Sequence, residues 1–247
     1  MEYEDFKNLK INPVNSSKLT LIIISKFLGF SELIIFEIRL KRKDCDIYDT
    51  VRMLCEKVSQ LEKENKLIKF KLENKIFKNE KEIDFIKNKI KQIPLYKDSK
   101  INLKLKFRLT DDGIKVTDFH RICNFIPNNI VLVFTSTGER FGGFTRLPWT
   151  SSNQNKKNDN AFCFSLTRKK IYRIIEGLDA IGDYSNNGPT FLNNIFCVGS
   201  SSNVLTNGNC SNKGKSNYYG EGLNYEINNY NQYFEVREFE FYEVLFQ

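Results

Sequence analysis

The spacing of apolar residues changes abruptly at Pro94, and this change constrains the fold of the 247-residue chain more than any other feature. Before Pro94, apolar residues recur every three or four positions, as they do along one face of a long helix. From Ile101 to Arg108 they alternate with polar residues instead, which is typical of a half-buried strand. The sequence therefore predicts an α+β protein with a long N-terminal coiled-coil helix and then an antiparallel two-sheet β-sandwich with short flanking helices.

Composition excludes several classes of function. The chain carries 38 Lys and Arg against 30 Asp and Glu, a net charge of +8. This excess is spread along the whole chain rather than gathered in one basic stripe, so we expect no nucleic-acid partner. A single His excludes a metal site built from several histidines of this chain. We expect neither a metal nor another cofactor.

Six cysteines are scattered through the chain without a C-x-x-C motif. This spacing predicts neither a zinc site nor a secreted disulfide framework, and reduced thiols in a cytoplasmic protein are the simplest interpretation. The acidic first residues, Met1-Glu2-Tyr3-Glu4-Asp5, also lack the basic and apolar pattern of a secretory leader. The cysteines are Cys45, Cys55, Cys123, Cys163, Cys197 and Cys210.

Residues 1–43 are predicted to form a short helical segment. Two apolar runs, at 21–24 and 33–36, are separated by Gly29 and Ser31, which favour a turn between two helices. A single membrane span is the alternative, but Lys26 and Glu32 interrupt it, each at a cost of about 2.5–3.5 kcal/mol at a bilayer centre. We therefore expect no transmembrane segment and a helical hairpin that a partner or second copy covers.

Residues 44–93 have the 3-4 apolar spacing of a coiled coil. Asn65 at a seam position favours a parallel, in-register homodimer, although folding back at a stutter near Ile76 stays open. Ile83, Ile86, Ile90 and Ile93 are expected to resume the seam before Pro94 ends the helix. Packing of one long amphipathic helix on its own domain is disfavoured, since 48 residues span roughly 70 Å. The predicted dimer seam is Val51, Leu54, Val58, Leu61, Asn65, Ile68 and Leu72.

The remainder of the chain, 95–247, has the short apolar segments of an antiparallel β protein. A helix at 116–123 is expected with Thr117 as its cap, and Gly142-Gly143 predicts a bulge or a close backbone approach to a buried Trp149. Polar loops are expected at 151–160 and 199–216. The predicted strands are 101–108, 130–135, 140–144, 161–166, 170–175, 191–198 and 233–246.

A series of short motifs in this region resembles the TLDc domain family. In chain order they are Asp112-Gly113, Asp118-Phe119-His120-Arg121 with Cys123, Phe141-Gly142-Gly143-Phe144, Pro148-Trp149 with Ser151-Ser152, Asp159, 161–166, Gly188-Pro189-Thr190-Phe191 and 236–242. The resemblance implies a β-sandwich that binds other proteins, described for the family as association with the vacuolar proton-pumping ATPase and protection against oxidative stress. A coiled coil before the domain is similar to the arrangement in amoebozoan or ciliate members. The resemblance to this family also implies a cytoplasmic protein that reaches endolysosomal membranes through a partner.

Two classes of function are weighed for the polar residues. As a non-enzymatic interaction module, the chain would use exposed loops on a rigid scaffold. As a small thiol-dependent redox or hydrolytic enzyme, it would use His120 with Cys123, or Cys210 in its polar loop. We favour the first, with no catalytic residue, because no third residue that would orient His120 is identifiable. The candidate partner-binding residues are Lys156, Lys157, Asp118, His120, Arg121 and Glu240.

Overall fold

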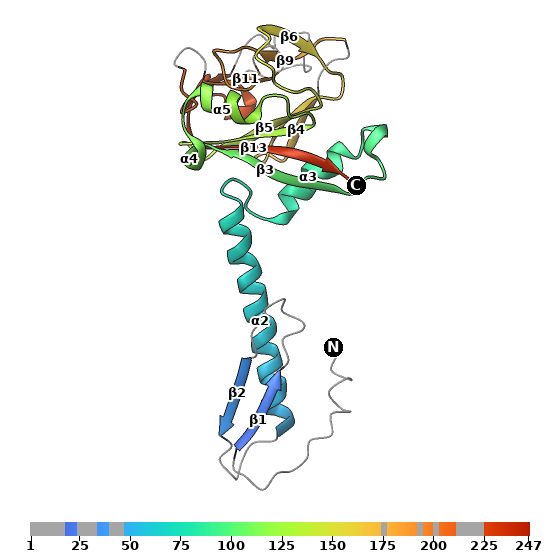
Figure 1. The fold of residues 1–247 in the computed structure, drawn as a ribbon, viewed down its shortest axis with the longest axis vertical. Helices are drawn as coiled ribbons and strands as arrows, with labels where there is room; N and C mark the ends of the chain where they lie inside the picture. The colour runs from blue at the N-terminus through green and yellow to red at the C-terminus, as the bar shows by residue number, and fades with distance from the viewer. Residues whose placement is uncertain are drawn as a thin grey trace. The chain divides into compact units, whose positions relative to one another are not determined.

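The computed structural model describes residues 18–23, 34–39, 47–173, 177–191, 195–199, 203–210 and 225–247. The chain divides into two compact units, Met1–Ile68 and Lys69–Gln247. Figure 1 shows their elements in order along the chain. In the part of the chain described, no helix is both long enough and apolar enough to cross a membrane.

The first unit contains a β-hairpin where helices were expected. Strand β1 (Lys18–Ile23) pairs antiparallel with β2 (Ile34–Arg39), so the prediction of two apolar helices is wrong for these segments. Their β-branched residues prefer strands, and periodicity cannot distinguish a short apolar run in a strand from one in a helix. The remainder of 1–43 lies outside the described residues.

The long helix predicted to reach Ile93 ends twenty residues earlier. Helix α2 spans Ile47–Glu73, and a second helix, α3 (Glu80–Ile90), begins after Asn79, whose side chain accepts a hydrogen bond from the Glu82 N–H. The expectation of one continuous helix over 44–93 is therefore wrong. The stutter near Ile76 marks the point where the chain leaves the helix, because the apolar side chains beyond it pack on the sheet.

Eleven strands of the second unit form one antiparallel sheet in the described residues, in the order β6-β9-β10-β11-β12-β13-β4-β5-β7-β8, with β3 also paired to β13. Strand β13 pairs with β4 along one edge and with β12 and then β3 along the other, so it belongs to both halves of the sheet (Figure 1). The strands are β3 Ile101–Arg108, β4 Asn129–Thr135, β5 Arg140–Thr145, β6 Gln154–Lys157, β7 Phe162–Ser165, β8 Lys170–Arg173, β9 Asp179–Asp183, β10 Thr190–Phe191, β11 Phe196–Val198, β12 Asn207–Cys210 and β13 Tyr233–Phe246.

Most of the predicted strands of this unit are confirmed, but strand β9 was not predicted and three further elements differ. The strand predicted at 191–198 is two strands, β10 and β11, paired antiparallel with each other. The predicted loops 151–160 and 199–216 contain β6 and β12. Both strands are rich in Asn and other polar residues, so they lack the apolar alternation that identifies a strand from sequence.

Short helices connect the strands: η2 (Pro94–Tyr96), α4 (Leu109–Asp112), α5 (Val116–Cys123) and η3 (Glu226–Asn228). The predicted helix at 116–123 is confirmed as α5, although its N-cap is Lys115 and not Thr117. The carboxylate of Asp118 accepts a hydrogen bond from the Lys115 N–H at 3.2 Å, which satisfies one backbone donor at the helix start.

The first core cluster lies between α5 and facing parts of the sheet. Trp149 is 1% exposed and donates its indole N–H to Asn129, which confirms it as a core residue. A side chain at Gly143 would lie 2.6 Å from the ring of Phe191, so this glycine permits β5 and β10 to approach closely. The predicted close approach is thus confirmed, but it is to Phe191 and not Trp149. The predicted bulge is wrong, because the ladders of β5 run without a register shift.

The second core cluster covers the opposite face of the sheet with the chain between α2 and β3. Ile76, Ile86 and Ile90 are almost fully buried there against residues of β4, β5 and β7. Arg140 of β5 holds this segment in place: it donates to the Ile76 carbonyl at 3.0 Å and forms a two-pronged ion pair with Glu82 at 2.6 and 2.8 Å. The apolar residues expected to resume a coiled-coil seam therefore pack on the sheet.

Candidate functional site

A buried carboxylate at the end of β9 organises the segment that follows Trp149. The side chain of Asp183 is 0% exposed. It accepts hydrogen bonds from the backbone N–H groups of Thr150, Ser151 and Ser152 and from the hydroxyls of Thr150 and Ser152, at 2.6–3.1 Å. Lys156 adds an ion pair at 2.7 Å. Burial raises the pKa of Asp183, but the hydrogen bonds from Lys156 and Thr150 outweigh burial and hold the pKa below its usual range.

Lys156 does not lie in a polar loop, as was predicted for residues 151–160. It lies in β6, and its ammonium also donates to the Pro148 carbonyl at 3.1 Å and to the Thr150 hydroxyl at 2.7 Å. These contacts use all three of its donors. Lys157, the next residue, is exposed on the same edge strand and stays a candidate contact residue.

His120 is half-buried and joins three segments. Its Nδ1 lies 2.9 Å from Asn124 Oδ1 and 3.1 Å from the Ser151 hydroxyl, while Nε2 lies 2.9 Å from the Asn187 carbonyl oxygen. The Asn187 contact requires a proton on Nε2, because a carbonyl oxygen only accepts. Cys123 lies one turn away but is fully buried, so the structure does not bring it to His120 as a reacting pair. The imidazole instead ties α5 to the segments at Ser151 and Asn187.

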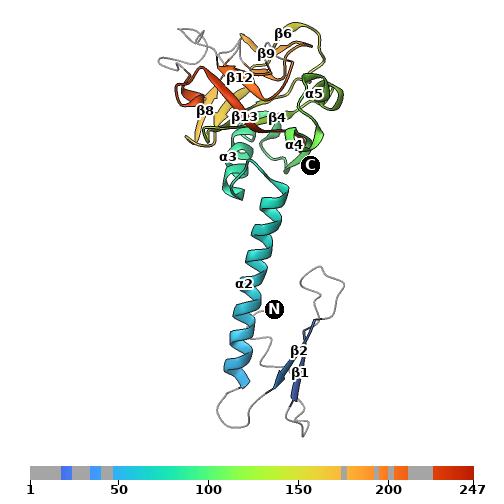
Figure 2. The same ribbon diagram turned by 90° about the vertical axis from the view of Figure 1, so that its left-hand side faces the viewer.

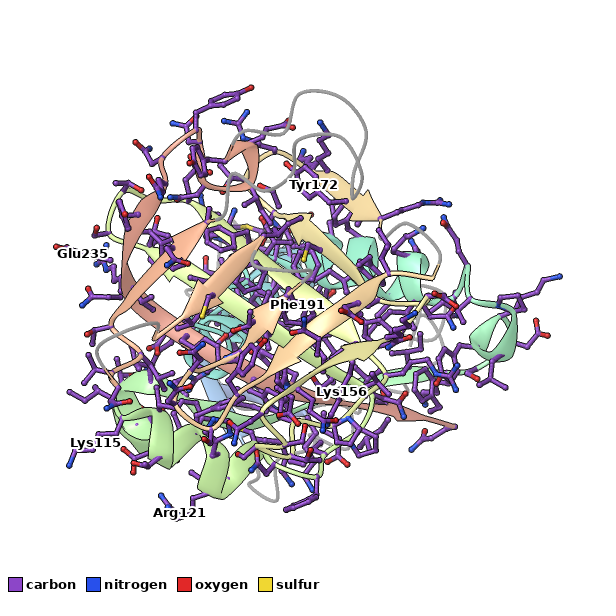
Figure 3. The ribbon with its side chains drawn as sticks, turned by 90° about the horizontal axis from the view of Figure 1, so that it is seen from above. Lys115, Arg121, Lys156, Tyr172, Phe191 and Glu235 are labelled. Carbon is purple, nitrogen blue, oxygen red and sulfur yellow. The ribbon has the colours of Figure 1, made fainter. Side chains whose placement is uncertain are left out.

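The outer side of α5 presents the exposed residues of this region. Arg121 points outward at the rim of the unit, as Lys115 does, whereas Phe191 lies near the centre of the sheet (Figure 3). Phe125 follows the helix with φ of +67° and is 74% exposed. A bulky residue rarely adopts this left-handed conformation. The hydrogen bond from the Phe125 N–H to the Trp149 carbonyl at 2.8 Å holds it there.

Glu240 lies inside the unit and not on its surface, which corrects its place among the predicted partner-binding residues. Its side chain is 0% exposed, and one oxygen pairs with Arg108 at 2.7 Å and accepts from the Lys75 N–H at 3.3 Å. The other oxygen accepts from the Tyr242 hydroxyl at 2.9 Å. Glu238 is also buried and accepts from Thr110. The two carboxylates therefore anchor the chain after α2 and the start of α4 to β13.

The thiols of this unit are unsuited to nucleophilic chemistry. Cys210 was predicted to lie in a polar loop, but it lies in β12 and is 1% exposed, so that prediction is wrong. Burial raises the pKa of Cys210, and burial together with the nearby Asp112 raises the pKa of Cys123. A reactive thiol needs the opposite shift and access to solvent. Cys163 in β7 and Cys197 in β11 are buried as well.

Sequence reasoning missed the central residue of this region, Asp183. In the sequence, Asp183 is a single carboxylate after the apolar Ala180-Ile181-Gly182. A residue of a turn would give the same pattern. The donors to Asp183, from Thr150 to Lys156, lie far earlier in the chain, and the pairing of β6 with β9 brings them to its carboxylate. Among the described residues, no group of three or more His, Cys, Asp or Glu could hold a metal ion.

Comparison with known proteins gives one clear result. The sequence model of the TLDc domain matches residues 71–245, which is most of the chain. No curated protein matches. The matched region begins near the end of α2 and includes α3, in agreement with the packing of α3 on the sheet.

Proposed function

The chain belongs to the TLDc domain family, and from this premise we propose that it is a non-enzymatic protein-interaction module. One observation carries the proposal: the polar side chains with catalytic potential are engaged in holding elements of the second unit together. His120 joins α5 to two other segments, and Asp183 and Glu240 each accept several hydrogen bonds from distant parts of the chain. Parts of the sheet face each other across the first core. We propose that they form a two-layer sandwich, which would serve as a rigid scaffold.

The partner we propose is the vacuolar proton-pumping ATPase, with a role in protection against oxidative stress, as the TLDc family implies. The protein would then act in the cytoplasm and reach endolysosomal membranes through this partner. Exposed residues around α5 and β6, among them Arg121 and Lys157, are the contact residues we propose. Recognition by such residues depends on surface shape and charge and not on a nucleophile.

Two measurements test the proposal. The first is binding of the purified chain to the solubilised ATPase, followed by interferometry. The second is the survival of peroxide-treated cells that contain the chain. The Cys123→Ala/Cys210→Ala variant should bind the ATPase and protect cells as the wild type does. Loss of protection with intact binding would instead assign the activity to a thiol. Failure of the wild-type chain to bind the ATPase would remove this partner.

We also propose that α2 forms a homodimer through its apolar seam. Leu61 and Ile68 are 49% and 54% exposed, Val58 is partly exposed, and Asn65 is exposed at its seam position. The remaining seam residues (Val51, Leu54 and Leu72) lie where side chains are not described. Burial of each apolar seam residue in a dimer would contribute about 1.5–3 kcal/mol, which favours association over an exposed stripe.

Light scattering of the full chain tests the dimer. The wild type should give twice the 29.0 kDa chain mass, and Leu61→Glu/Ile68→Glu should give the monomer mass. The control Lys63→Glu/Lys66→Glu changes charge on the same helix at positions outside the seam and should stay dimeric. A monomeric wild type at micromolar concentration would exclude the seam as a dimer contact.

A further inference from the structure

Strand β8 (Lys170–Arg173) ends the hydrogen-bonded order of the sheet. It pairs with β7 along one edge, and no backbone hydrogen bond of its other edge is found among the described residues. Figure 2 shows β8 at the outside of the second unit. Such an edge presents N–H and C=O groups that can pair with another extended segment.

Two cations converge beside this edge. The Lys89 ammonium on α3 and the Arg173 guanidinium on β8 both donate to the side-chain oxygen of Gln92, at 2.8 and 3.3 Å. Lys89 also lies 6.0 Å from the centre of the Phe162 ring. Partial burial, followed by the charge of Arg173, lowers the pKa of Lys89. Two like charges therefore share one neutral acceptor, an arrangement that an anionic group between them would stabilise.

The positive charges beside β8 are only partly matched by carboxylates of the described residues. Lys156 on β6 pairs with Asp183, and Arg108 on β3 pairs with Glu240. At β8, Lys170 pairs with Glu226. Neither Lys89 nor Arg173 has a carboxylate partner among the described residues.

The turn before β8 extends this basic character. Arg168 lies 5.3 Å from the centre of the Tyr230 ring, which is 59% exposed, and Lys169 is exposed at the turn. Basic residues on an edge strand hinder pairing with a second copy of the same strand, because like charges would meet. They favour a strand of opposite charge for the same reason.

We propose that the outer edge of β8, the one not paired with β7, binds an extended acidic segment of a partner protein, which adds as a further strand and places a carboxylate between Lys89 and Arg173. Side chains of Ile171 and Arg173 lie on the face covered by α3, since alternate residues of a strand share a face. A residue of the added strand beside Arg173 would point to the same face and reach both cations. This inference rests on the proposed interaction function and specifies the chemistry of a partner segment.

The test uses the full-length chain and synthetic peptides, followed by fluorescence anisotropy. A labelled heptapeptide of alternating Glu and Val should bind in a saturable manner, and the same peptide with Lys in place of Glu should not. Two further Glu-Val peptides are N-methylated on alternate backbone amides. One is methylated at the Glu residues and the other at the Val residues. Only one of them should lose binding, because a strand presents alternate amides to its neighbour. Equal binding of both would refute strand addition.

Protein variants test the position of the site. Arg173→Glu should weaken binding by about tenfold or more, the loss expected for a charge-assisted contact, and Lys89→Gln should weaken it less. Lys157→Glu on edge strand β6 makes the same charge change and should have no effect. Binding that is lost in Lys157→Glu but kept in Arg173→Glu would overturn the assignment. Concentration-dependent self-association that Arg173→Glu abolishes would identify a second copy as the occupant instead.

Failure here is distinguishable from failure of the proposed function. If the acidic peptide does not bind while the wild-type chain still binds the proton-pumping ATPase, the β8 inference is wrong and the interaction module stands. If the peptide binds at β8 and the ATPase does not bind, the edge is confirmed and the partner must be another protein with an acidic extended segment.

Discussion

Replacement of Asp183 by Asn should strongly destabilise the second unit. The carboxylate is 0% exposed, pairs with Lys156 and accepts five further hydrogen bonds. An amide keeps the volume but removes the charge and turns an NH2 group toward donors. Loss of one partner of a buried ion pair costs about 3–5 kcal/mol, so we expect this decrease in the free energy of unfolding at pH 7.

The effect should depend on pH in a defined direction. The pKa of Asp183 is lower in the folded protein than in the unfolded chain, so its stabilisation is complete above the unfolded pKa of about 3.9 and is lost as the pH falls further. The difference between wild type and Asp183→Asn should therefore be largest above about pH 5 and shrink in stronger acid. Once protonated, the wild-type side chain resembles the amide.

Urea unfolding followed by fluorescence measures both quantities, because the single Trp of the chain, Trp149, lies next to this segment. Asp179→Asn is the matched control, since Asp179 begins the same strand and is only partly buried. It should change the free energy of unfolding by about 0.5 kcal/mol or less. A decrease below about 1 kcal/mol for Asp183→Asn, or a decrease that stays constant down to pH 3, would refute the reasoning.

Three other results are expected. Trp149→Ala should lower the free energy of unfolding by about 3–5 kcal/mol through the cavity it leaves. Phe125→Ala, which removes an exposed side chain, should change the free energy of unfolding by about 0.5 kcal/mol or less. Urea titrations measure both. Brief alkylation of the native chain at pH 8, read by mass spectrometry, should label the exposed Cys55 and leave Cys210 unlabelled until urea unfolds the chain. Glu82→Gln should cost about 1.5–3 kcal/mol in the same titrations, because the buried Arg140 keeps only a neutral partner; a loss under 0.5 kcal/mol would show that the ion pair is dispensable.

Sequence patterns predicted the elements whose periodicity is local. The alternation from Ile101 to Arg108 and the pattern around Phe119 identified β3 and α5, and the apolar run at 130–135 identified β4. These patterns work because an element that buries one face must repeat apolar residues at its own period. The burial of Trp149 was predictable for a related reason. A large aromatic side chain among apolar segments contributes most to stability when it is buried.

Other features depend on residues that are distant in sequence. Ile76, Ile86 and Ile90 fit a coiled-coil seam as well as they fit the face of a sheet, and only the ion pair of Arg140 with Glu82 and the burial in the second core decide between the two. The apolar run in β1 is equally ambiguous, because a short run satisfies the burial pattern of either a helix or a strand.

The sequence by itself determined the family, the order of the main strands and the burial of Trp149, because each depends on local pattern or on motifs in chain order. Only the tertiary structure decided that Lys156 is tied to Asp183, that Cys210 is buried and that Arg173 and Lys89 both donate to Gln92 beside the last strand of the sheet. These facts follow from strand pairing and helix packing between residues far apart in the chain. A polar side chain has the same local sequence signature whether it faces water or a buried partner, so its role is set by the contacts that folding brings to it.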